Sequence, residues 1–150
     1  VSGRGGTSWS KVEYERGGNL PGFGEWGFPT VLAVAEGAMA GNIICTGGVR
    51  DGIDAAKGIA LGAKMAGAAM PFLKAKKPEQ EIEKWIGQIK TCMFLSGSAD
   101  LNALSKAPLM ITGKSAEMME LRGIEPAEYA RRGGQEKKKK ANGSNTNYYL

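Results

Sequence analysis

The stretch that most constrains the fold runs from Asn42 to Gly52 and reads NIICTGGVRDG. It starts as a short β-branched apolar run, passes through Gly47 and Gly48, and continues into a segment with apolar residues at helical spacing. A continuous apolar run is typical of a strand buried on both faces, as in parallel sheets covered by helices. Asp51 lies where an acidic N-cap belongs. The stretch therefore predicts a strand, a tight glycine turn and a helix.

The residues after this helix repeat the arrangement. The segment 63–69 consists mostly of small and apolar residues and predicts a second strand, which ends in another turn of small residues. The first turn places unpaired backbone N–H groups at a helix N-terminus, where the helix dipole favours an anion. We therefore expect a phosphate group between the two strand ends, as in an enzyme with a phosphorylated cofactor.

The first 28 residues are rich in glycine and predict loops more than regular structure. Val1–Gly3 is typical of the end of a strand, and the chain is expected to be a fragment. Two interpretations of the glycine-rich turn over residues 1–9 stay open. The hydroxyl groups of Ser2 or Thr7 contact a phosphate or ring oxygen, or the segment is an irregular loop.

Helical patterns fill most of the remaining chain. Pro29 is favoured in a first helical turn and predicts a helix that ends at Gly37 or Gly41. A long helix is predicted from about 78 to 96. Its apolar face, which we expect in the core, consists of Ile82, Trp85, Ile86, Ile89 and Met93. The later elements are predicted, in order, as a helix over 100–106, an extended segment over 109–112, a helix over 115–122 and a helix that begins at Pro126.

Composition and charge narrow the class of function. With 42% hydrophobic and 23% charged residues, the chain is expected to form one domain over 1–134, followed by a polar lysine-rich tail over 135–150. Most of the net charge of +5 comes from the run Lys137–Lys140, so nucleic acid is not an expected partner. No window approaches the roughly 18 apolar residues of a membrane span. Cys45 and Cys92 fit no disulfide or CxxC pattern, which favours a reducing, cytoplasmic setting.

The order of the elements predicts the fold class. Three strand–helix units in succession are typical of an α/β parallel sheet or barrel. Three strands cannot close a barrel, so further sequence or a partner chain must supply the rest. Unpaired sheet edges also favour association, and we expect a homo-oligomer.

Several motifs resemble type 2 isopentenyl-diphosphate isomerases, and they match the C-terminal part of that family over about residues 1–132. In chain order they are SGRGGTSW at 2–9, WGFPT at 26–30, GGVRDGIDAAK at 47–57, ALGA at 60–63, PFLK at 71–74, LSGS at 95–98 and LRGI at 121–124. The glycine turn followed by ALGA is shared with other FMN-dependent barrels. The succession of GGTSW, WGFPT and PFLK is much more specific.

This resemblance implies a C-terminal portion of a TIM (β/α)8 barrel, about strands six to eight, followed by C-terminal helices. It implies dependence on FMN, Mg²⁺ and NADPH, with the Mg²⁺ ligands outside this chain and no metal ligand within it. The implied reaction interconverts isopentenyl and dimethylallyl diphosphate, with the reduced flavin as acid and base. Implied FMN contacts are Ser2, Thr7, Gly47, Gly48, Val49, Arg50, Gly67, Ala68 and Ala69. By the same resemblance, Trp9 walls the substrate pocket and the catalytic candidate Glu13 lies near the reacting atoms.

The chain also departs from the family pattern. The basic, histidine and acidic motifs that hold the diphosphate and Mg²⁺ belong to the family's N-terminal half and are not found here, so the chain alone is expected to be incomplete. Another FMN-dependent barrel enzyme, such as an oxidase, stays open, although those oxidases use a catalytic histidine and this chain contains none. The third alternative is a half-barrel that only binds a phosphorylated ligand or a partner chain.

Overall fold

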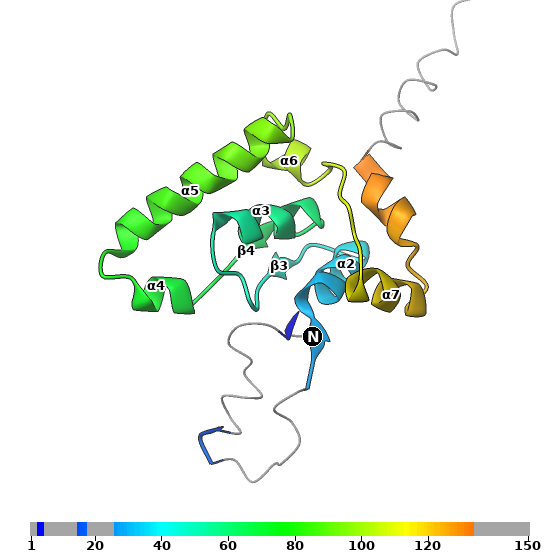
Figure 1. The fold of residues 1–150 in the computed structure, drawn as a ribbon, viewed down its shortest axis with the longest axis horizontal. Helices are drawn as coiled ribbons and strands as arrows, with labels where there is room; N and C mark the ends of the chain where they lie inside the picture. Colours follow the sequence, from blue (N-terminus) through cyan, green and yellow to red (C-terminus); the bar gives the residue numbers. More distant parts are fainter. Residues whose placement is uncertain (1–2, 5–14, 18–25, 134–150) are drawn as a thin grey trace, which may run out of the picture.

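The computed structural model describes residues 3–4, 15–17 and 26–133 (Figure 1). Their helices and strands follow in the order β1 (Gly3–Arg4), β2 (Phe28–Pro29), α2 (Thr30–Ala40), β3 (Ile44–Cys45), α3 (Gly52–Ala60), β4 (Met65–Ala66), α4 (Met70–Lys74), α5 (Pro78–Leu95), α6 (Leu101–Leu104) and α7 (Lys114–Leu121). A last helical stretch is described over 126–133. The predicted α/β class is confirmed.

The described strands form two separate parallel pairs, β1 with β2 and β3 with β4. In the second pair, Ile44 lies opposite Met65 and Cys45 lies opposite Ala66. The prediction of a strand over 63–69 is therefore wrong in length, because only two of these residues pair as a strand.

Strand β2 is not predicted by the sequence pattern, in which Pro29 opens a helix. In the structure Pro29 ends the strand and precedes α2 as its N-cap residue, with an extended ψ of 140°. Proline has no N–H to donate, so it is tolerated at the margin of a sheet. The helix itself is confirmed, because α2 covers Thr30–Ala40 and is followed by Gly41.

Helix α3 occupies the centre of the fold, between α5 and the β3–β4 pair (Figure 1). Glycine makes this close packing possible. A Cβ atom added to Gly58 would lie 2.6 Å from Sγ of Cys45, and one added to Gly52 would overlap the backbone carbonyl of Trp85. Because these glycines carry no side chain, the β3–β4 pair and α5 can approach α3 closely from two sides.

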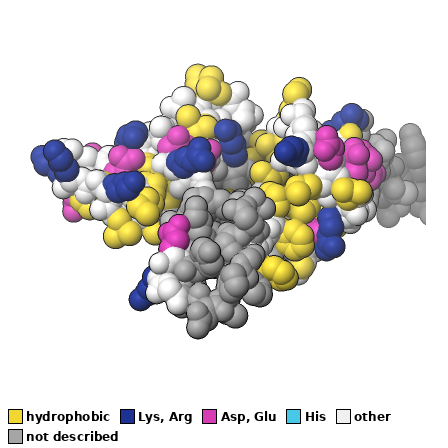
Figure 2. All heavy atoms as spheres, turned by 60° about the horizontal axis from the view of Figure 1, so that its bottom comes forward, with side chains coloured by type: hydrophobic (Ala, Val, Ile, Leu, Met, Phe, Trp, Pro, Cys, Tyr) yellow, Lys and Arg dark blue, Asp and Glu magenta, His cyan; other side chains and the backbone are white. Residues whose placement is uncertain are grey.

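The core prediction for α5 is only partly right. Trp85 is buried and its ring packs 4.8 Å from the ring of Phe72, measured between centroids. Ile82 and Ile86, however, are 48% and 46% exposed, so their prediction as core residues is wrong. Helical periodicity shows that a helix has an apolar face, but not how wide a surface covers that face. Figure 2 shows hydrophobic side chains at the surface among lysines and arginines.

The last helical stretch links α2 to the C-terminal end of α3. The hydroxyl group of Tyr129 donates a 2.6 Å hydrogen bond to the backbone carbonyl of Leu61, and the carbonyl of Ala35 lies 3.4 Å from the same hydroxyl oxygen. Burial raises the pKa of this phenol, while the positive charge of Arg132 opposes the shift. The guanidinium of Arg132 also donates to the carbonyl of Ala60 and stacks on the Tyr129 ring. These contacts fix the middle of α2 and the C-terminal end of α3 relative to each other.

Candidate functional site

The glycine turn after β3 has a backbone that few residues other than glycine can adopt. Gly47 and Gly48 have φ angles of +89° and +78°, both in the left-handed region. Two successive residues of this kind turn the chain sharply from the strand toward α3. The hydroxyl group of Thr30, at the start of α2, donates a 2.7 Å hydrogen bond to the carbonyl of Gly47.

The N-terminus of α3 is satisfied by the protein's own side chains. Asp51 is its N-cap and accepts hydrogen bonds from the N–H groups of Ile53 and Asp54, both at 2.9 Å. The side-chain oxygen of Gln88 on α5 accepts from the N–H of Gly52 at 2.8 Å. An anion therefore cannot use these donors without displacing a side chain, and the carboxylate of Asp51 adds negative charge there.

Donors remain in the turn itself. Within the described part of the chain, no acceptor engages the N–H groups of Gly47, Gly48 or Val49, whereas the N–H of Arg50 donates to the carboxylate of Asp54 at 3.3 Å. Successive backbone N–H groups in such a turn form a concave anion-binding nest. The N–H groups that stay unengaged among the described residues therefore lie in the turn, at Gly47, Gly48 and Val49, and not at the end of the helix.

The end of β4 lies directly beside this turn. The N–H of Gly67 donates to the carbonyl of Cys45 at 2.9 Å, and a Cβ atom added to Gly67 would lie 3.3 Å from Cγ2 of Thr46. The two segments predicted to share a phosphate are therefore adjacent. The Gly67 N–H is used within the sheet, while the N–H groups of Ala68 and Ala69 engage no acceptor among the described residues.

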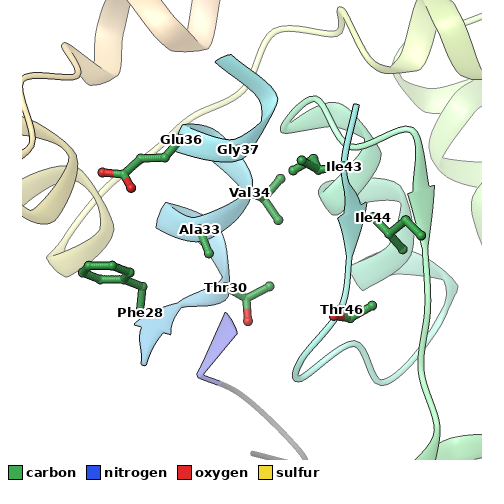
Figure 3. A pocket seen from close by; sticks show the side chains of 9 residues that line it. All are labelled: Phe28, Thr30, Ala33, Val34, Glu36, Gly37, Ile43, Ile44 and Thr46. Carbon is green, nitrogen blue, oxygen red and sulfur yellow. The ribbon is translucent and has the colours of Figure 1, made fainter. Parts of the chain in front are cut away.

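A cavity of about 400 Å³ lies between α2 and β3 (Figure 3). Its lining is mostly apolar and consists of Phe28, Thr30, Ala33, Val34, Glu36, Gly37, Ile43, Ile44 and Thr46. Thr30 and Thr46 lie at one end of it, near the glycine turn. On the other side, Glu36 pairs with the guanidinium of Arg122, which raises the pKa of that arginine, and Arg122 also stacks 5.6 Å from the Phe28 ring centroid.

Sequence reasoning did not assign a role to Thr30, although it lies in the motif WGFPT. Its partner Gly47 is 17 residues away, and only the fold brings the two together. The predicted site residues Ser2, Thr7, Trp9 and Glu13, and the tail 135–150, lie outside the described residues.

Among the described residues, no three or more His, Cys, Asp or Glu side chains gather into a possible metal site. Within the same ranges, no helix combines the length and apolarity needed to cross a membrane.

A glycine turn with unengaged N–H groups at the ends of two parallel strands is typical of α/β proteins that bind phosphorylated cofactors. Residues 28–111, more than half of the chain, match the FMN-dependent dehydrogenase family, and the chain belongs to that family. The matched range contains the glycine turn and the end of β4. The nest and the small residues beside it fit the phosphate end of FMN.

The chain is also similar to curated proteins called isopentenyl-diphosphate delta-isomerase. The protein from Methanothrix thermoacetophila is 45% identical over 141 residues, which cover 83% of this chain and 39% of the relative. The one from Methanothermobacter thermautotrophicus is 42% identical, over 88% of this chain and 41% of the relative. The one from Thermococcus onnurineus is 46% identical, over 81% of this chain and 36% of the relative. The resemblance expected from the sequence is confirmed, and the chain spans about two fifths of these relatives.

Proposed function

We propose that this chain is the C-terminal part of a type 2 isopentenyl-diphosphate isomerase, and that it holds the phosphate of FMN. One observation carries the phosphate assignment: the parallel β3–β4 register places the Gly47–Val49 turn beside residues 67–69. The sequence identity with proteins called isopentenyl-diphosphate delta-isomerase from three organisms supports the reaction.

In this proposal the chain's own residues bind and orient the cofactor. The N–H groups of Gly47, Gly48 and Val49 donate to phosphate oxygens, with Ala68 and Ala69 on the opposite side and Arg50 supplying positive charge at the exposed rim. Interconverting the two diphosphates requires a proton delivered to one carbon and removed from another. The bound flavin would supply that acid and base chemistry, while the protein positions the ring and excludes water.

The remaining assignments are part of the same proposal. We place β1, β3 and β4 as barrel strands six, seven and eight, and we place Ser2 and Thr7 at the flavin, Trp9 at the substrate and Glu13 near the reacting atoms. Mg²⁺ and NADPH would be required, with the Mg²⁺ ligands in the other part of the enzyme. The whole protein would be a cytoplasmic homo-oligomer.

The phosphate assignment is tested with Gly48→Val. A valine at this left-handed backbone position strains the turn and blocks the approach of a phosphate, so the affinity for FMN should fall by at least about tenfold, the equivalent of ~1.4 kcal/mol. Flavin fluorescence titration measures this loss. Gly97→Val is a matched control, because Gly97 has a φ of +65° but no atom within 4 Å of an added Cβ, and it lies past the end of α5. Equal affinity in wild type and Gly48→Val would reject the assignment.

The isomerase assignment has a separate test. The chain is fused to the N-terminal part of the Methanothrix relative, reduced with FMN present, and supplied with isopentenyl diphosphate and Mg²⁺. We expect dimethylallyl diphosphate to form. A fusion that binds FMN but forms no product would favour another FMN-dependent enzyme.

A further inference from the structure

The side chain of Thr30 makes a contact that its position at a helix start does not require. Thr30 is the first residue of α2 and follows the N-cap Pro29, so it does not occupy the position from which a threonine caps its own helix. The Thr30 hydroxyl instead donates across the fold to the Gly47 carbonyl, at 2.7 Å and in a partly buried position. This contact ties α2 to the glycine turn.

The hydrogen bond to the Gly47 carbonyl also affects the direction of the next N–H group, that of Gly48. The carbonyl of Gly47 and the N–H of Gly48 belong to the same planar, trans peptide group, so they point in opposite directions. A hydrogen bond that fixes the carbonyl therefore also fixes the direction of the N–H. The Gly48 N–H is one of the donors that no described acceptor engages.

An anchor matters here because glycine flanks this peptide group on both sides. Glycine adopts positive and negative φ angles about equally readily, so a peptide group between two glycines can rotate at little steric cost. In the alternative orientation the carbonyl oxygen of Gly47 would face the anion and repel it. A single neutral side-chain hydrogen bond is enough to bias such a peptide group.

We propose that Thr30 is a positioning residue for phosphate recognition: by holding the Gly47 carbonyl, it presents the Gly48 N–H to the cofactor phosphate. This inference rests on the proposed function, because it requires that the turn binds the phosphate of FMN. Thr30 itself contacts the turn and not the phosphate.

The test compares FMN with riboflavin, which has the same ring but no phosphate. Both are titrated against wild type, Thr30→Val and Thr30→Ser. Valine keeps the shape of threonine but cannot donate, so we expect Thr30→Val to weaken FMN binding about three- to tenfold, as the loss of one hydrogen bond implies. Riboflavin affinity should change less than about twofold, and Thr30→Ser should restore FMN binding.

Thr91→Val is the matched control. The Thr91 hydroxyl also donates to a glycine carbonyl, that of Gly87, at 2.9 Å, but on the exposed side of α5. This variant should leave both affinities unchanged, and urea unfolding of all variants shows whether the fold is intact.

The outcomes separate the two claims. Equal losses of FMN and riboflavin affinity in Thr30→Val would indicate a general loosening of the cavity and overturn the positioning role. A wild type that prefers FMN, together with a Thr30→Val variant that keeps the full preference, would overturn the inference but leave the proposed function standing. A wild type without preference for FMN over riboflavin would overturn both.

Discussion

The two faces of the β3–β4 pair differ in what covers them. On one face, Cys45 is 3% exposed and packs against Gly58 of α3. On the other face, Ile44 and Met65 lie opposite each other in the register and are 54% and 57% exposed. Successive side chains of a strand point to opposite faces, so two adjacent residues of one strand have very different surroundings.

This difference shows that the described part of the chain covers only one face of the β3–β4 pair. Parallel sheets are almost always covered on both faces. Here the helices cover one face, while the other presents large apolar side chains. We take this as support for the proposal that the chain is part of a barrel, because the open face is the one that a closed barrel would turn inward. The stability of this chain should therefore depend mainly on the covered face.

The largest expected effect is on the covered face, at Gly58. An alanine there adds a Cβ atom 2.6 Å from Sγ and 2.9 Å from Cβ of Cys45, and such overpacking costs about 1–3 kcal/mol. Urea unfolding should show this loss. Gly87→Ala, on α5 with no atom within 4 Å of the new Cβ, should instead gain about 0.5–1 kcal/mol from helix propensity. A Gly58→Ala variant as stable as Gly87→Ala would mean that the covered face is loosely packed.

The second prediction concerns the thiol on the same face. Burial, and to a smaller extent the negative charge of Asp54, raises the pKa of Cys45 above its ordinary value of 9.0. The unfolded chain then loses this proton at lower pH than the folded chain. The stabilising contribution is complete below pH 9 and is lost as the pH rises through the folded pKa.

Unfolding curves between pH 7 and 11 measure this slope. Wild type should lose stability toward the alkaline end, and Cys45→Ala should lose less. The comparison between the two variants matters because the buried Tyr129 phenol, whose pKa is also raised, adds to the slope of both above about pH 10. Identical slopes would show that the Cys45 thiol is accessible to water.

The smallest effect is expected on the open face. Ile44→Ala removes a side chain that is more than half exposed, so the free energy of unfolding should change by less than about 0.5 kcal/mol. A loss above about 2 kcal/mol would show that something covers this face in solution. Sedimentation of wild type and Ile44→Ala would then show whether a second copy of the chain covers this face.

Much of the local structure could be predicted from short-range patterns. The N-cap Asp51, the tight glycine turn, the helix after it and the extents of α2 and α5 follow from interactions within a few residues, and the structure confirms them. The site was partly predictable as well, because parallel pairing of two strands necessarily brings their C-terminal ends together. Strand β2 and the exposure of Ile82 could not be predicted, because each depends on which other part of the protein packs against that segment.

By itself, the sequence determined where the chain turns and which backbone groups a glycine turn leaves available. Sterics and capping act over a few residues, so their signal is local. Only the tertiary structure decided which donors are already occupied and which residue anchors the turn. The pairs Thr30–Gly47, Gln88–Gly52 and Tyr129–Leu61 are 17, 36 and 68 residues apart. Each depends on packing between helices, because no local pattern links the positions of two residues so far apart in the chain.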